Sequence, residues 1–269
     1  MDIARVDASA TRGTSALHRA VPGAKLAAFA LVLTGVVASA NVLVVGGIAL
    51  TLVAVIVALR LPWRPMLLLA LYPGIFGAIY SFAVATDVLS ASLIILKAIT
   101  AALVAVLLMF TTPYPQVFAP IQRVLPAVIG DALLMTYRSL FLLLEKFSHT
   151  LTAVRLRAGL IGASPIRSAA TITRSLGGVL LYSIDLSQRT HDVMYLRGYD
   201  GRLVVTPQPS VSAWIDRGVV IVGAAIGVMA VAWRIWWPGL NPYAWIPPLV
   251  ATALLAVALA WRALRKEPV

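Results

Sequence analysis

The chain has 269 residues, of which 61% are hydrophobic and only 12% are charged, and its mean hydropathy is +0.93. A soluble globular domain carries about 45–50% apolar and about 25% charged residues, so this composition excludes an ordinary soluble protein and predicts a chain embedded in a lipid bilayer. The formal net charge of +12 would suggest nucleic acid in a soluble protein, whereas in a membrane protein it marks the cytoplasmic side, and we expect no nucleic-acid partner.

Six apolar runs have the length of about 20 residues that a helix needs to cross a bilayer. They cover about residues 24–40, 42–59, 65–84, 90–110, 213–236 and 243–261. Thr111-Thr112-Pro113 ends the fourth run. Between the last two runs lie tryptophan and tyrosine residues typical of the membrane interface, and Asn241 followed by Pro242 is expected to cap the final helix.

The basic residues predict the orientation of these spans. With the N-terminus inside, only Lys97 and Arg234 of the 22 lysine and arginine residues fall outside the cytoplasmic segments. Such asymmetry predicts that both termini are cytoplasmic and that the number of spans is even. We therefore predict six spans in a cell membrane. Five or seven spans are the alternative if residues 126–146 partly enter the bilayer.

The central stretch, about residues 114–210, holds ten of the basic residues and does not fit the spanning pattern. Apolar residues at helical spacing predict an amphipathic helix that ends at Arg157-Ala158-Gly159. A second amphipathic helix is expected to begin at Ser164-Pro165, an N-cap with a first-turn proline, and to end at Arg197-Gly198. Glycine there can take the left-handed conformation that ends many helices.

The expected fold is all-α: a polytopic membrane helix bundle of about six spans with two long amphipathic cytoplasmic helices. The predicted segments are a cytoplasmic N-terminal segment (1–23), membrane helices 1–4 (24–112), the cytoplasmic helix region (113–210), membrane helices 5–6 (211–262) and a cytoplasmic tail (263–269).

A few charged residues lie within apolar stretches, and each has a structural explanation. Lys97 is expected to reach the membrane interface or to pair with Asp87 rather than to serve transport. Asp131 is expected to form an ion pair with Arg138 or Arg123.

Histidines and glycines offer two further candidates. His18, His149 and His191 lie on separate segments, so we expect unrelated surface histidines and no metal site. The glycines of Gly46-Gly47 and Gly74…Gly77 permit close helix approach, either to a partner or within the bundle.

Several segments, in order along the chain, resemble the T component of energy-coupling factor (ECF) transporters, the EcfT/CbiQ family. They are the stretch Leu17–Leu26 with its Pro and Lys, the Thr111-Thr112-Pro113 stop, the Tyr137-Arg138…Glu145 segment, and the two helix ends Val154–Gly159 and Met194–Arg202. The helix ends resemble the paired Ala-Arg-Gly signatures of the family. They depart from them at Ala158, which follows Arg157, and at Leu196, which precedes Arg197.

The resemblance implies a non-catalytic subunit that transmits the ATP-driven motion of two cytoplasmic ABC ATPases to a substrate-binding membrane subunit, the S component. It implies ATPase-coupling roles for Arg157, Gly159, Arg197 and Gly198, and supporting roles in the coupling helices for Arg155, Tyr137, Arg138 and Glu145. It implies no cofactor or metal on this chain, with ATP on the partner subunits. The cobalt/nickel (CbiQ-like) branch is favoured, and a T component for a vitamin is the alternative.

Two other classes of protein are weighed against this interpretation. A stand-alone secondary carrier would need intramembrane polar groups and often repeated halves, and the sequence offers little of either. A lipid-modifying enzyme would need clustered Asp, Glu or His at one membrane face, whereas the acids here are dispersed. The sequence contains no P-loop, no Gly-x-Ser-x-Gly motif and no His-Glu-x-x-His motif. No motif therefore indicates an enzyme.

Overall fold

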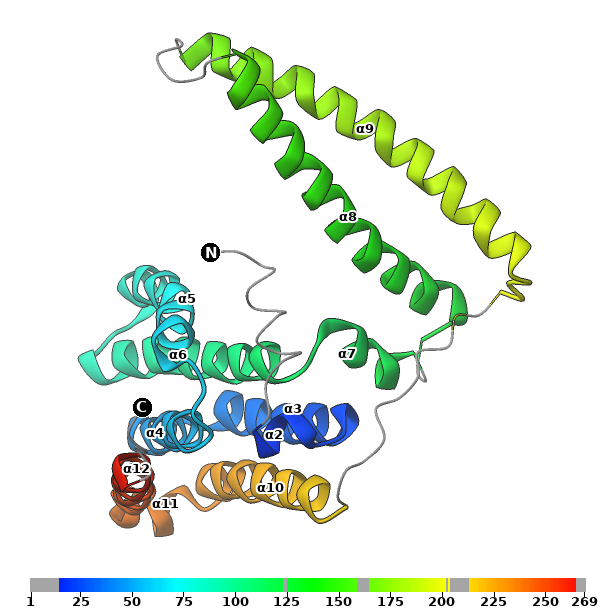
Figure 1. Ribbon diagram of the computed structural model, residues 1–269. Coiled ribbons are helices and arrows are strands. Elements are labelled where there is room, and N and C mark those ends of the chain that lie inside the picture. The colour runs from blue at the N-terminus through cyan, green and yellow to red at the C-terminus, as the bar shows by residue number, and fades with distance from the viewer. Residues whose placement is uncertain (1–14, 123–124, 159–164, 202, 204–212, 265–269) are drawn as a thin grey trace. The chain divides into compact units, whose positions relative to one another are not determined.

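The structure is a computed structural model that describes residues 15–122, 125–158, 165–201, 203 and 213–264. Within these ranges the chain forms helices and no strand, which confirms the predicted all-α class (Figure 1). It divides into two compact units. The first, here called the membrane unit, combines the chain up to Val117 with the chain from Pro207, and the second covers Phe118–Thr206.

In its described residues the membrane unit contains six apolar helices. They are α3 (Pro22–Ala38), α4 (Val42–Ala58), α5 (Trp63–Val84), α6 (Val88–Thr111), α10 (Ala213–Ile235) and α12 (Ile246–Leu264). Short helical segments accompany them: α2 (Ala16–Arg19), α11 (Trp237–Leu240) and the 3-10 helix η1 (Asn241–Tyr243). The helix α7 (Tyr114–Ile121) connects the two units along the chain.

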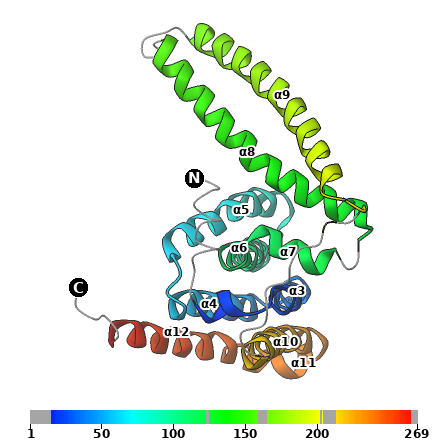
Figure 2. The ribbon, with the colours of Figure 1, turned by 45° about the vertical axis from the view of Figure 1, so that its right-hand side comes forward.

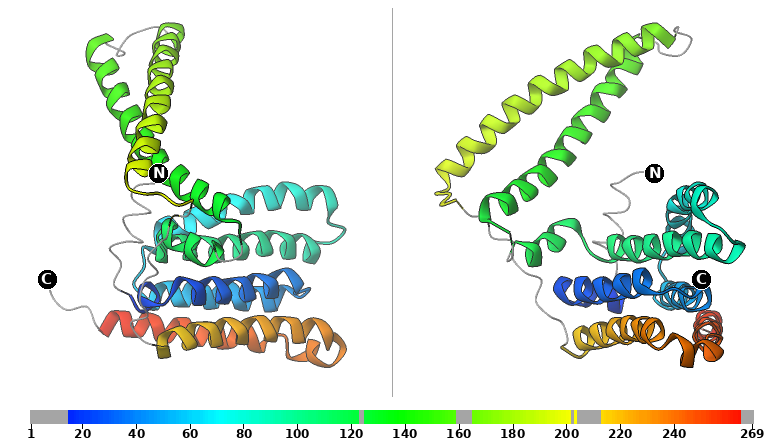
Figure 3. Two further views of the ribbon diagram at one scale, coloured as in Figure 1. Left: turned by 90° about the vertical axis from the view of Figure 1, so that its right-hand side faces the viewer. Right: turned by 180° about the vertical axis from the view of Figure 1, so that it is seen from behind.

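The six helices form three layers of two. Helix α3 packs on α10 and α4 packs on α12 (Figure 2), while α6 contacts α5, α4 and α3. The α3–α4 layer therefore lies between the α5–α6 layer and the α10–α12 layer (Figure 3, left). The buried core lies around this central layer, at Val36, Val44, Ile48 and Leu107 among others.

Four of these segments are long and apolar enough to cross a membrane: α5, α6, α10 and Asn241–Arg262. Helices α3 and α4 are apolar and 17 residues long, at the lower end of the range of about 17–25 residues that a span needs. The chain is thus an all-α, multi-pass membrane bundle. The exact number of six spans stays a prediction.

Two asparagines lie at turns of the membrane unit, and only Asn41 acts as a helix cap. Asn41 caps α4, because its side-chain oxygen accepts a hydrogen bond from the backbone N–H of Leu43 at 2.9 Å. Asn241 was expected to cap the last span. It instead begins η1, and its side-chain oxygen accepts a bond from the Asn41 amide at 3.1 Å. The side chain of Asn241 thus binds Asn41, 200 positions away, and does not cap a helix. No local sequence pattern reveals such a contact.

Of the two alternatives for Lys97, pairing with Asp87 is wrong, and reaching the membrane interface stays a prediction. The Lys97 ammonium donates to the backbone oxygen of Val37 at 2.9 Å, in the last turn of α3. Carbonyl groups there lack partners within the helix, so an ammonium group is favourable at that end. Asp87 contributes to the capping box at the start of α6, where its backbone N–H donates to the Ser90 hydroxyl at 3.1 Å.

His18 is buried, so the prediction of a surface histidine is wrong there, although His149 and His191 are exposed. Its Nε2 lies 3.1 Å from the backbone oxygen of Phe110, which can only accept, so Nε2 is the donor. Its Nδ1 lies 2.7 Å from the hydroxyl of Ser15. The histidine therefore binds a carbonyl group at the C-terminal end of α6.

Lys25 is also fully buried at this place. Its ammonium donates to the backbone oxygens of Thr111 at 3.0 Å and of His18 at 3.4 Å. We call His18 and Lys25 the α6 clamp, because together they bind the carbonyl groups of the last two residues of α6. The stop predicted at Thr111-Thr112-Pro113 is confirmed by the end of α6 at Thr111.

Gly47 and Gly74, two of the glycines noted in the sequence, lie at close contacts inside the bundle. A Cβ atom on Gly47 would lie 2.8 Å from the backbone carbon of Pro247, and one on Gly74 would lie 2.7 Å from the side chain of Ile99. Glycine at these positions therefore permits the close approach of α4 to α12 and of α5 to α6.

Candidate functional site

Two long helices dominate the second unit. Helices α8 (Ala127–Ala158) and α9 (Pro165–Leu196) each have 32 residues and are therefore about 48 Å long. They run antiparallel and contact each other (Figures 1 and 3). The predicted end of the first helix and the start and end of the second are confirmed. Ser164, the expected N-cap, lies outside the described residues.

The two signature arginines lie at opposite ends of this helix pair. Arg157 is in the last turn of α8, and Arg197 directly follows α9. Because the helices are antiparallel, a whole helix length separates the two positions. The side chains of Arg155 and Arg157, and all of Gly159, lie outside the described part of the structure.

The end of α9 has the predicted glycine geometry. Gly198 has a φ of +72°, in the left-handed region that favours glycine. The backbone N–H of Tyr199 donates to the oxygen of Met194 at 3.1 Å, and that of Gly198 donates to the oxygen of Tyr195 at 3.1 Å. This arrangement is typical of a Schellman-type helix end, and it turns the chain back after Arg197.

A buried carboxylate binds the chain after this turn. Asp131, near the start of α8, has only 6% of its surface exposed. The Tyr199 hydroxyl donates to its Oδ2 at 2.5 Å, and the backbone N–H of Leu203 donates to its Oδ1 at 2.9 Å. The expected ion pair with Arg138 is wrong, since none joins these residues in the described part of the structure. Arg123 lies outside it.

The contact between Asp131 and Tyr199 changes the acidity of the phenol. Donation of the hydroxyl proton to the carboxylate raises the pKa of Tyr199, and desolvation and the negative charges of Asp131 and Asp200 add to the effect. A raised pKa keeps the hydroxyl protonated, so it remains a donor to Asp131 at neutral pH.

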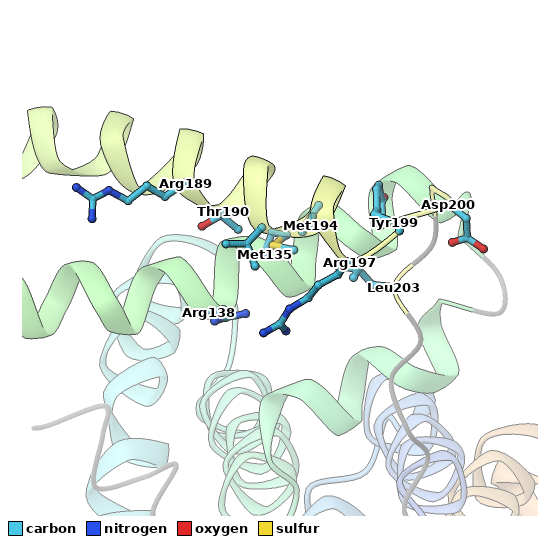
Figure 4. Close-up of a pocket in the computed structure, with 11 residues that line it drawn as sticks. Met135, Arg138, Arg189, Thr190, Met194, Arg197, Tyr199, Asp200 and Leu203 are labelled. Carbon is cyan, nitrogen blue, oxygen red and sulfur yellow. The ribbon is translucent and has the colours of Figure 1, made fainter.

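A pocket of about 420 Å³ lies between the start of α8 and the end of α9. Figure 4 shows that Arg138 and Arg197 extend toward the same space, one from each helix. Among the described residues neither takes part in an ion pair, whereas the neighbouring Arg189 pairs with Asp185 at 3.0 Å. The pocket thus presents two guanidinium groups that are available to an acidic group.

The structure brings only some of the predicted site residues together. Arg138, Arg197 and Gly198 all line the pocket. Tyr137 instead packs edge-to-face against Phe141, with ring centroids 4.9 Å apart. Glu145 is exposed and faces His149 on the same helix, with an N–O distance of 3.7 Å.

The contacts in this unit that were not predicted include two between segments far apart in the sequence. The first is the bond of Asp131 to Tyr199, for which the position of a lone acid in an apolar stretch was the available signal. The second joins α8 to α9, where the Lys146 ammonium lies 5.0 Å from the ring centre of Tyr182. Nothing in the local sequence pairs these two residues.

The side chains that line the pocket can bind an acidic group. Arginine can hold a carboxylate through two parallel hydrogen bonds. Two arginines together select a negatively charged group and hold it in one position. Within the described ranges, no cluster of His, Asp or Glu has the arrangement of a metal site. The arrangement therefore supports a docking role.

Comparison with known families places the chain beside a family of transport proteins. A family model described as CbiQ, cobalt transport protein, matches residues 13–209 of the chain. No curated protein matches the sequence. The matched region includes α3 to α6 of the membrane unit, both long helices and the pocket with Arg138 and Arg197.

Proposed function

Because the chain belongs to the CbiQ cobalt transport protein family, a family of membrane permease components of ECF-type transporters, we propose that it is the energy-coupling transmembrane subunit of an ATP-driven importer. In this role it binds two cytoplasmic ABC ATPases and a membrane S subunit. It transmits motion between them and does not hydrolyse ATP or bind a cofactor itself.

The pocket with Arg138 and Arg197 carries this proposal. Arg197 extends from the end of a 32-residue helix, and Arg138 adds a second cation from the antiparallel helix. We assign this pair to an acidic side chain on one ATPase. Two guanidinium groups that form no ion pair with the described residues are well suited to a carboxylate from another protein.

The opposite end of the helix pair is assigned to the second ATPase. Arg157 and Gly159 belong to that end, and Arg155 supports them. The separation of about 48 Å between the two helix ends supports contact with two different subunits. The cation–π contact between Lys146 and Tyr182 joins the helices, which favours their movement as one lever.

The proposed compartments follow from the distribution of positive charge. Residues 113–210 and both termini are placed in the cytoplasm, and the membrane unit contacts the S subunit within the bilayer. The transported substrate proposed here is cobalt or nickel, in keeping with the family. Cation uptake by cells that express the complete transporter would distinguish these metals from a vitamin.

Copurification tests the ATPase contacts. The variant Arg157→Glu with Arg197→Glu should reduce copurified ATPase by about 30-fold or more, since loss of a buried charge contact costs about 2–5 kcal/mol. Gln188→Glu, an exposed change on α9, should retain the ATPase. Full ATPase binding and cobalt uptake by the double variant would contradict the proposal.

A further inference from the structure

The membrane unit contains a second, apolar pocket of about 290 Å³ between α3, α4, α6 and α10. Its inner walls include the buried residues Phe29, Val32, Leu52 and Leu107. The hydroxyl group of Thr51 in the lining donates to the backbone oxygen of Gly47 at 2.8 Å, so it does not offer a hydrogen-bond donor to the pocket. Apolar cavities of roughly 150 Å³ already stay dry and bind apolar ligands, so this pocket suits hydrocarbon.

The α10 side of the pocket lies beside a cationic and aromatic pair. Ile215, Gly218 and Val222 line the pocket at helical spacing. Trp214 directly precedes Ile215, and Arg217 directly precedes Gly218. Because Trp214 and Arg217 are three residues apart, they lie together on the helix face next to the one that lines the pocket. Both are exposed, and the Arg217 guanidinium lies 5.9 Å from the Trp214 ring centre.

This pair has the character of a membrane interface, where tryptophan and arginine at a helix end meet lipid headgroups. The nearby acid, Asp216, accepts a hydrogen bond from the backbone N–H of Val21 at 2.7 Å and is thereby engaged at the start of α3. Arg217 is thus the exposed charge of the first turns of α10 beside the pocket.

Gly218 leaves the side of the pocket open. A Cβ atom on Gly218 would meet nothing within 4 Å, whereas one on Gly223 would lie 2.7 Å from the Cα of Ala28. Packing between α10 and α3 thus requires glycine at position 223 but not at 218. A side chain at position 218 would occupy space that the pocket now offers to a ligand.

We propose that this pocket binds one acyl chain of an anionic phospholipid, whose phosphate group is bound by Arg217. The apolar walls accept the chain, and the cation beside the opening selects the charge of the headgroup. This lipid site does not depend on the coupling role proposed above, because it requires neither an ATPase nor an S subunit.

Native mass spectrometry of the purified full-length chain tests this site. We expect the wild type to retain phosphatidylglycerol with about fivefold preference over phosphatidylcholine of the same chain length, the effect of about one basic residue on an anionic lipid. Arg217→Gln should abolish the preference. Arg234→Gln, which removes an exposed arginine at the other end of α10, should preserve it.

Gly218→Leu tests the hydrocarbon part of the site separately. It should reduce retention of both lipids while circular dichroism and the melting temperature stay close to those of the wild type. Unchanged lipid retention by Gly218→Leu, or equal retention of the two lipids by the wild type, would overturn the proposal. The proposal would also be overturned if Gly218→Leu released a copurified protein or a second copy of the chain and left the bound lipid in place.

Discussion

At the scale of single residues, Asp131 connects the start of α8 to the chain that follows the end of α9. A buried carboxylate is costly unless it accepts hydrogen bonds, and here Tyr199 and Leu203 both donate to it. These donors come from the chain just after α9, so the carboxylate fixes the turn that follows Arg197. The position of the arginine therefore depends on an acid that lies 66 residues before it in the sequence.

The raised pKa of Tyr199 gives a prediction about pH. An ordinary tyrosine titrates near pH 10, and a group whose pKa is raised by folding stabilises the fold below that pH and loses this contribution as pH rises through its folded pKa. Absorbance at 295 nm should show a tyrosinate step above pH 10 in the wild type that is missing in Tyr199→Phe. If the absorbance step that Tyr199→Phe removes lies at or below pH 10, the bond to Asp131 would be contradicted.

The α6 clamp gives a prediction about stability. Lys25→Met should leave the backbone oxygen of Thr111 without its donor in a buried place, at a cost of about 1–3 kcal/mol. The melting temperature of the purified protein should fall accordingly. Arg19→Met removes an exposed cation near the same end and should change the melting temperature much less. Equal losses for the two variants would argue against the clamp.

At the scale of helices, α10 packs on α3 through a pair of glycines that the sequence interpretation did not single out. Gly223 and Gly227 are four residues apart, the spacing that lets membrane helices approach closely. Gly35 lies opposite them, and a Cβ atom on it would be 3.0 Å from the Cα of Gly227. Small residues on both helices therefore allow their backbones to come into contact.

Substitution of these glycines should separate the helices. A Cβ atom on Gly227 would lie 2.7 Å from the backbone oxygen of Leu31, which cannot rotate away as a side chain does. Gly227→Leu should therefore lower stability by at least the cost of overpacking, about 1–3 kcal/mol. Gly218→Leu is the matched control on the same helix, since it meets open space. Thermal melting of the two variants should differ clearly, and equal melting temperatures would disprove this account of the contact.

At the scale of the whole molecule, the predicted orientation can be tested directly because the chain contains no cysteine. Single cysteines at Thr86, between α5 and α6, and at Gln188 on α9 both lie at exposed positions. An impermeant maleimide should label Thr86→Cys in intact cells. It should label Gln188→Cys only after the membrane is permeabilised, because residues 113–210 are predicted to be cytoplasmic.

Labelling of Gln188→Cys in intact cells would place α9 outside the cytoplasm, and the proposed ATPase contact would then be impossible. The cysteine-free wild type provides the background signal for both positions.

Local features of the chain were predicted well. The end of α8 at Ala158, the start of α9 at Pro165 and the left-handed Gly198 follow from proline, glycine and apolar spacing, which act within a few residues. The pairing of Lys97 with Asp87, the pairing of Asp131 with Arg138 and the cap at Asn241 were predicted wrongly, and the burial of His18 was missed. Each of these side chains binds a group far away in the sequence, on another element.

The sequence by itself determined that this protein is an all-α membrane bundle with two long amphipathic helices that each end near an arginine. Those properties depend on apolar content, helical periodicity and residues at helix ends, which need no knowledge of tertiary contacts. Only the tertiary structure decided that Arg138 joins Arg197 in one pocket, that Asp131 binds Tyr199, and that α10 leaves an apolar pocket beside Gly218. These depend on which helices become neighbours, and that choice is made by packing across the whole chain.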